Sequence, residues 1–134
     1  MPECVFCKIV AKQAHASIVY DDDQVTAFLS NHPINVGHTL VVPKKHYENI
    51  YEMPEKEVAY LFTIVKKVAA AVKQATCIGG IRLVQNNGGD AGQIVFHLHV
   101  HVIPMKPMEH IFHEHSFRAS ELLDQDAEEI KRMI

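Results

Sequence analysis

Three histidines separated by single apolar residues, His97, His99 and His101, constrain this chain more than any other feature. They lie within residues 92–104, GQIVFHLHVHVIP, where two kinds of side chain alternate as in a β-strand with two different faces. A glycine-rich stretch precedes this segment, and Pro104 is expected to end it. The alternation predicts an apolar face turned to a core, made of Phe96, Leu98, Val100 and Val102. It predicts a second face that carries Val95, the three histidines and Ile103.

The spacing of these histidines excludes one kind of metal site. Side chains at alternate strand positions are roughly 6.5–7 Å apart, so the outer two are about 13 Å apart. Zinc–nitrogen bonds measure about 2.0–2.1 Å, so one ion cannot bind all three imidazoles. The row can instead present one imidazole as a nucleophile, with an imidazole on each side that positions and stabilises the reacting groups. A polar sheet face that carries histidines by chance is the alternative, in a chain with 10 histidines among 134 residues, but the strict alternation favours a motif.

Composition places the chain among globular proteins. Its 134 residues suffice for one domain, 1–134, with a core that needs no disulfides. A net charge of -3 argues against a nucleic-acid partner. The first ten residues carry no signal-peptide pattern and no apolar run approaches a membrane span, so we expect a cytoplasmic protein without a membrane partner. Three cysteines, two of them spaced Cys4-x-x-Cys7, fit a reducing compartment and indicate metal or redox chemistry.

The remaining pattern predicts an α+β fold with a five-stranded antiparallel sheet, a main helix and a C-terminal helix. The expected strands are 17–20, 25–29, 38–43, 81–85 and 94–103, and the expected helices are 4–13, 54–76 and 120–133. In the main helix the apolar side is expected to carry Ala59, Phe62, Val65, Ala69 and Val72. In the last helix Ser120 is expected to cap the first turn, with Leu122, Leu123, Ala127 and Ile130 on the apolar side.

Residues 97–103, HLHVHVI, resemble the His-φ-His-φ-His-φ-φ signature of the histidine triad (HIT) family of nucleotide hydrolases and transferases. The segments CVFCKI, FLSNHPINVGHTLVVPKKH and NNGGDAGQIVFHLHVHVIP follow in family order, so the likeness covers nearly all of residues 3–104. Residues 105–134 then form a C-terminal segment and helix. The sequence is most similar to the Hint branch and its microbial relatives. This resemblance implies a HIT-like fold.

The resemblance also implies a mechanism. The middle histidine, His99, would attack the α-phosphorus of a purine nucleotide, and water would release a nucleoside monophosphate from the nucleotidyl-histidine. Neutral imidazole is a good nucleophile, and with an ordinary pKa of about 6.5 it dominates at neutral pH. His101 would donate a hydrogen bond to the charged phosphate oxygens, and His97 completes the catalytic triad. Transferase relatives have glutamine at the third position of the triad, so the histidine there, His101, favours a hydrolase. The expected substrates are phosphoramidates or acyl adenylates.

By position, the family's binding residues also transfer to this chain. Asn86, Gln93, His99 and His101 would line the phosphate site, and Gly92, with Gly88 and Gly89, would let the backbone approach the phosphate. An apolar base pocket would consist of Val5, Phe6, Ile9, Phe28 and Leu29. Ser30 stands where relatives usually place an acidic or amide group on the ribose. Ile94 replaces the usual serine or threonine, so leaving groups that need a proton should react less well.

Cys4 and Cys7 supply two thiolates, whereas a structural zinc ion needs four ligands. The resemblance to microbial members implies that His46 and His97 are the other two, giving one zinc per chain. A thioredoxin-like redox pair would have to open a helix after a strand, and only three residues precede Cys4. A pair of buried free thiols is the other alternative.

The resemblance further implies a homodimer, and the apolar content of the main helix and fourth strand agrees with it. We assign no role to His110, His113 and His115. Two other functions remain open. A dinucleoside polyphosphate hydrolase would use the same site with a different leaving group. A zinc-stabilised nucleotide-binding module would bind nucleotides without turnover.

Overall fold

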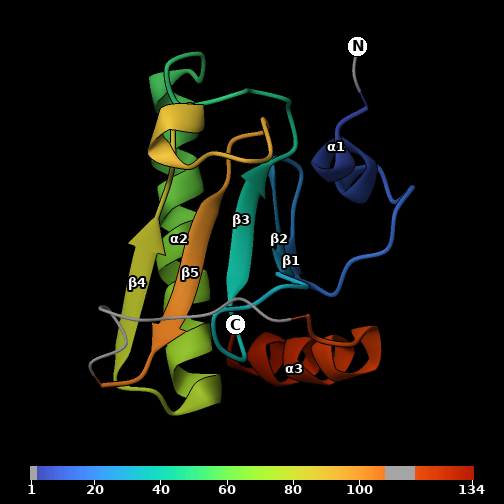
Figure 1. Ribbon diagram of the computed structural model, residues 1–134, viewed down its shortest axis with the longest axis vertical. Coiled ribbons are helices and arrows are strands. Elements are labelled where there is room, and N and C mark those ends of the chain that lie inside the picture. Colours follow the sequence, from blue (N-terminus) through green and yellow to red (C-terminus); the bar gives the residue numbers. More distant parts are fainter. Residues whose placement is uncertain (1–2, 108–116) are drawn as a thin grey trace.

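The computed structural model describes residues 3–107 and 117–134. Five strands form one antiparallel sheet in the order β1-β2-β3-β5-β4 (Figure 1). This confirms the predicted α+β class and the five-stranded sheet. The strands are β1 (Ile18–Asp21), β2 (Val25–Leu29), β3 (Thr39–Pro43), β4 (Gly80–Val84) and β5 (Val100–Met105). The helices are α1 (Val5–Val10), α2 (Glu55–Thr76) and α3 (Ser120–Met133), and η1 (Gly89–Ala91) is a short 3-10 turn.

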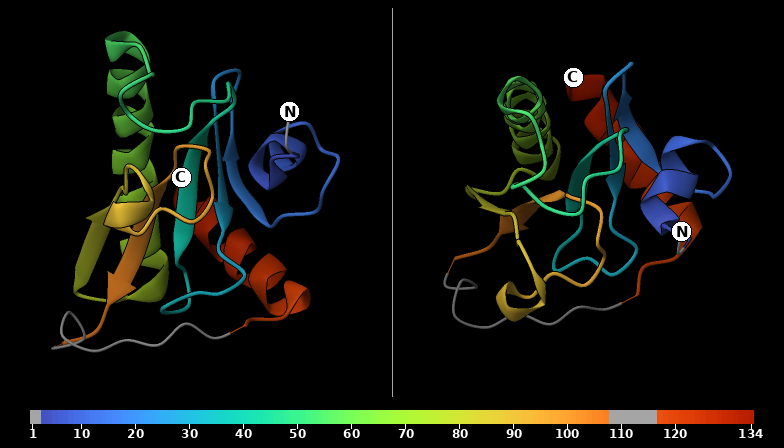
Figure 2. Two further views of the ribbon diagram at one scale, coloured as in Figure 1. Left: turned by 45° about the horizontal axis from the view of Figure 1, so that its top comes forward. Right: turned by 90° about the horizontal axis from the view of Figure 1, so that it is seen from above.

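The two faces of the sheet are covered differently. Seen from above, α2 lies on one side of the sheet, and α1 and η1 lie on the other (Figure 2). The α2 side holds the main core, in which strand residues such as Val41 and Val102 pack against α2 and α3. A smaller apolar cluster on the α1 side contains Phe6, Ile9, Phe28, Leu40 and Val42. This second face is only partly covered, and it is the face that leaves room for a ligand.

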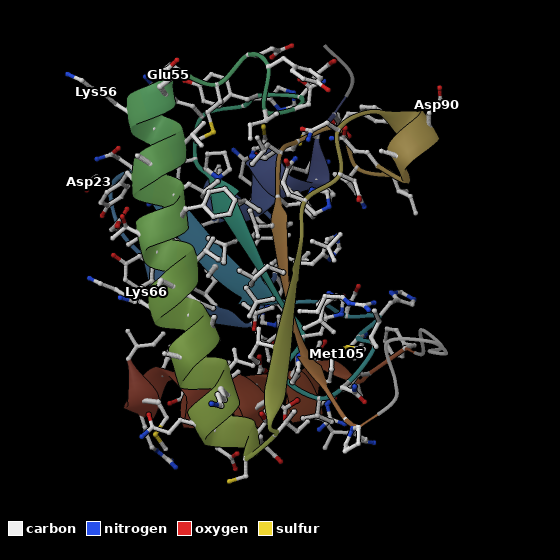
Figure 3. All side chains as sticks on the ribbon, turned by 90° about the vertical axis from the view of Figure 1, so that its left-hand side faces the viewer. Asp23, Glu55, Lys56, Lys66, Asp90 and Met105 are labelled. Carbon is white, nitrogen blue, oxygen red and sulfur yellow. The ribbon has the colours of Figure 1, made fainter. Side chains whose placement is uncertain are left out.

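The buried stripe of α2 agrees with the prediction at Val65 and Val72 and differs from it elsewhere. The buried residues are Leu61, Ile64, Val65, Val68, Ala71 and Val72. Ala59 and Phe62 are exposed instead, with Phe62 at 39%, and Ala69 is half-buried. The observed stripe begins at Leu61 and recurs at threes and fours. It buries more apolar area than the predicted stripe, which includes Ala59 and Ala69. On the opposite face, Lys56 and Lys66 point away from the sheet (Figure 3).

The predictions for α3 were partly wrong. Leu123, Ala127 and Ile130 are buried, as expected, but Leu122 is 43% exposed. Leu122 lies one residue before the buried stripe, which rotates it by about 100° out of the interface. The N-cap is Ala119, without a side-chain cap, and Ser120 is the first helical residue.

The histidine-rich segment enters the sheet later than predicted. Strand β5 begins at Val100, and the preceding residues are not paired with another strand: the Leu98 amide donates to the Tyr47 carbonyl. Phe96 therefore does not face the core and is 45% exposed, whereas Leu98, Val100 and Val102 are buried as expected.

Pro104 does not end the strand. It lies inside β5 opposite Ile81 of β4, while the pairing with β3 extends only to Val102. Residue 104 therefore donates no backbone hydrogen bond to β3, so a proline, which has no backbone N–H, can occupy it.

Candidate active site and metal centre

Four side chains from three separate segments converge on one point. Cys4 caps the N-terminus of α1, Cys7 lies in its first turn, His46 follows β3 and His97 precedes β5. Their ligand atoms all lie within 4.8 Å of one another. The Cys4 Sγ–His97 Nδ1 distance is 3.4 Å, and Cys7 Sγ lies 3.3 Å from His46 Nδ1 and 3.5 Å from His97 Nδ1. Ligand atoms around a tetrahedral zinc ion are about 3.6 Å apart, so the set fits a structural zinc site.

A hydrogen bond sets the tautomer of His97 so that one of its ring nitrogens is available to a metal. His97 Nε2 donates to the Pro43 carbonyl at 2.8 Å, which leaves the lone pair on Nδ1, the atom that faces the thiols. Burial, with the nearby His46 and His99 rings, outweighs that bond and lowers the pKa of His97 to about 4. Burial and Cys4 raise the pKa of Cys7 to about 11. A thiolate here therefore requires a neighbouring cation, a charge that zinc would supply.

We expect protein purified without added metal to contain about one zinc per chain by elemental analysis. Cys4→Ser should abolish most of this zinc and lower the melting temperature by about 10 °C or more, because the site joins α1 to the segments after β3 and before β5. The matched control is Cys77→Ser, since Cys77 is exposed and lies at the C-terminal end of α2, with φ at 56°. It should keep its zinc. A metal-free protein with unchanged melting temperature would contradict a structural role.

His99 is held as a neutral imidazole by the same segment. Its Nδ1 donates to the His97 carbonyl at 2.7 Å, so the lone pair lies on Nε2. Burial lowers the pKa of His99, despite that hydrogen bond, which keeps the ring neutral at neutral pH. The ring packs edge-on against Phe6, with centroids 5.1 Å apart. His97 therefore contributes both to the metal centre and to the orientation of His99.

His101 receives its orientation from a residue that sequence reasoning missed. His38 is 1% exposed, and its Nδ1 accepts a hydrogen bond from the Ile34 amide at 3.1 Å. Its proton therefore lies on Nε2, which is 3.0 Å from His101 Nδ1. As acceptor at Nδ1, His101 carries its own proton on Nε2, where it can act as a hydrogen-bond donor. The rings of His99 and His101 are 4.9 Å apart, closer than the strand spacing predicts, because His99 precedes β5.

A cavity of about 770 Å³ connects these histidines with an apolar pocket. Its size suits a small-molecule ligand of nucleotide dimensions or larger. Ser30 and Gly92 also line it, the latter in the left-handed conformation at φ 94° that glycine adopts without strain. The predicted site residues that line it are Val5, Phe6, Ile9, Phe28, Leu29, Ser30, Asn86, Gly92, His99 and His101.

The HIT domain family matches residues 11–108 of this chain. The chain belongs to the HIT family. It is 36% identical over 129 residues to adenylylsulfatase HINT3 of Arabidopsis thaliana, covering 96% of this chain and 66% of that one.

Solved structures agree with this assignment. A hypothetical histidine triad nucleotide-binding protein of Sulfolobus tokodaii has a TM-score of 0.90 at 37% identity, covering 97% of this chain and 91% of that one. A zinc-bound histidine triad family protein of Mycobacterium smegmatis has a TM-score of 0.85 at 30% identity, covering 98% and 92%. Together with the four converging ligands, this confirms the predicted zinc site.

Four residues predicted for the triad or the phosphate site do not line the cavity: Gly88, Gly89, Gln93 and His97. The Gln93 side chain is buried, accepts a hydrogen bond from the Gly88 amide at 2.7 Å and donates to the Glu48 carbonyl at 2.6 Å. Gln93 therefore holds the glycine turn. His97 is fully buried, and both of its ring nitrogens face protein atoms. The structure directs it toward the metal centre and the positioning of His99.

Some lining residues were not predicted. Besides His38, they include Arg82 and Val84 of β4 and Ser120 and Leu123 of α3. A basic residue in an edge strand and a serine at a helix start give no functional signal in a sequence.

His110, His113 and His115 lie outside the described residues. Within the described part of the chain, no helix is long and apolar enough to cross a membrane.

Proposed function

We propose that this HIT protein is a hydrolase that removes the substituent from the α-phosphate of a purine nucleotide and releases the nucleoside monophosphate. The observation that carries the proposal is the tautomer of His99. Its Nδ1 proton is bound to the His97 carbonyl, so a lone pair on Nε2 is available for attack. The adjoining cavity has an apolar end for the base, with Phe6 and Phe28 in edge-to-face contact at 5.3 Å.

In the proposed reaction, His99 Nε2 forms a bond to the α-phosphorus as the bond to the leaving group breaks. The bonding electrons go to the leaving atom. His101 donates from Nε2 to a non-bridging phosphate oxygen and stabilises the charge that builds up there. Water then attacks phosphorus, gives up a proton to solvent and breaks the phosphorus–nitrogen bond. That electron pair returns to His99, whose proton on Nδ1 is retained throughout.

The candidate substrates are phosphoramidates and acyl adenylates, together with adenylyl sulfate. Adenylyl sulfate is suggested by the name of the Arabidopsis relative, adenylylsulfatase HINT3. All of them present an α-phosphate joined to a leaving group that His99 would displace.

The test is turnover of an adenosine phosphoramidate, adenylyl sulfate and a diadenosine polyphosphate by purified protein, with AMP as the measured product. Steady release of AMP from the first two, preceded by a burst of one equivalent of leaving group per site, would support the proposal. Preference for the diadenosine polyphosphate would assign the alternative hydrolase function. Tight AMP binding without turnover of any substrate would indicate a binding module.

We also propose a homodimer. Strand β4 lies at the edge of the sheet, and its residue Leu83 is 48% exposed. The apolar Phe62 of α2 is 39% exposed. An open edge with exposed apolar side chains favours pairing with a second copy. Sedimentation at micromolar concentration should give twice the chain mass of 15.1 kDa, and Leu83→Asp should shift it toward the monomer. A monomer for the unmodified protein would contradict the proposal.

A further inference from the structure

The cavity continues beyond the reacting histidines, on the side away from the base pocket. The base pocket lies against α1 and β2, at one end of the cavity. His101 lies on β5, which is separated from β2 by β3. Arg82 and Val84, which also line the cavity, lie on β4 at the opposite edge of the sheet. A nucleotide whose base is in the pocket and whose α-phosphate is at His99 would therefore extend its leaving group toward β4.

The strand register places Arg82 beside this path. Val84 pairs with His101 and Arg82 pairs with Ile103, so both β4 residues share the face of the sheet that carries His101. Diagonal neighbours of this kind have Cα atoms about 7–8 Å apart, a distance that an arginine side chain spans. The Arg82 guanidinium thus has the reach to contact a group bound next to His101.

The charges around the cavity select the chemistry of that group. Arg82 is the only lysine or arginine among the described lining residues, and none of them is an aspartate or glutamate. A guanidinium keeps its positive charge at all ordinary pH values and binds oxyanions through paired N–H donors. An amine leaving group, which departs with added protons, gains nothing from such a neighbour. Ile94 also lines the cavity and has no proton to donate.

We infer that Arg82 binds the leaving group and that this group is an oxyanion, such as sulfate or phosphate. The inference rests on the proposed function. When the His99 Nε2–phosphorus bond forms, the phosphorus–oxygen bond to the leaving group breaks and its electron pair passes to the leaving oxygen. Sulfate or phosphate accepts that pair without a proton, and Arg82 stabilises the added negative charge.

The first experiment measures binding, because binding does not depend on turnover. Affinities for AMP and for the α,β-methylene analogue of ADP are compared by calorimetry in the unmodified protein, Arg82→Gln and Arg82→Lys. We expect the unmodified protein to prefer the analogue about 10-fold or more, as a charged hydrogen-bonding partner provides. Arg82→Gln should remove this preference and leave AMP affinity within about threefold. Arg82→Lys, which keeps the charge, should retain part of it. Arg132→Gln, an exposed arginine near the end of α3, is the matched control and should change nothing.

The second experiment measures turnover and separates the two oxyanions. Arg82→Gln should lower kcat/KM for adenylyl sulfate on the order of 10²-fold, and for an adenosine phosphoramidate with a neutral amine less than threefold. ADP replaces adenylyl sulfate in a parallel measurement, and the larger loss identifies sulfate or phosphate as the preferred group. Equal losses for amine and oxyanion substrates, or an unmodified protein that binds AMP without preferring the analogue, would overturn the inference alone. Failure of the unmodified protein to bind AMP would overturn the proposed function as well.

Discussion

His99→Gly should lower turnover by on the order of 10³-fold or more, because the covalent route through the nucleotidyl-histidine is lost. No neighbour can replace it. His97 has both ring nitrogens turned to protein atoms, and His101 accepts at Nδ1 from His38. AMP affinity should survive, because Phe6, Phe28 and the backbone at Gly92 are unchanged. The measurement is steady-state turnover of adenylyl sulfate or a phosphoramidate, paired with a titration of AMP.

A quenched reaction with labelled substrate locates the intermediate directly. The label should be acid-labile and base-stable, and it should be found on the peptide that contains His99. Label on His101 or His97 would contradict the assignment of the nucleophile. Normal turnover by His99→Gly would contradict the covalent mechanism itself.

His101→Ala should slow the same reaction by roughly 10²–10³-fold, because a donor to the charged phosphate oxygens is lost. His38→Ala should cost less, since His38 acts by fixing the tautomer of His101. In the double variant, loss of His38 should add little to the loss of His101, as expected for two residues that act as a unit.

His38→Gln provides the matched control for this pair, since its amide N–H can still donate to His101 Nδ1. It should recover part of the activity lost in His38→Ala. Additive losses in the double variant would show that His38 does not act through His101.

The sheet and the helices could be predicted from the sequence because apolar periodicity and turn residues agree along most of the chain. One error in the sheet occurred where alternation was extended beyond the hydrogen-bonded ladder. Phe96 follows the apolar alternation, but the backbone before Val100 pairs with a loop, so the side chain is exposed. Pattern alone does not reveal where a ladder begins.

The site was predictable to the extent that its residues follow a linear motif. His99, His101 and the four zinc ligands belong to such motifs. Arg82 does not, and His38, although it lies in one of the family-like segments, carried no predicted role. Each reaches the site through strand pairing: Leu40, two residues after His38, pairs with His101, and Arg82 pairs with Ile103. Gln93 belongs to the motif but is turned inward to support the turn. Its position in the sequence does not indicate the direction of its side chain.

Helix α3 lies beyond residue 108, where the match to the HIT domain ends, yet it supplies Ser120 and Leu123 to the cavity wall. Ser17, which also lines the cavity, donates to Asp124 of α3 at 2.6 Å. Part of the enclosure around a ligand is therefore built by a segment that the shared domain does not specify. Two HIT proteins with identical histidine motifs can differ in this wall. We expect ligand preference across the family to follow the C-terminal extension.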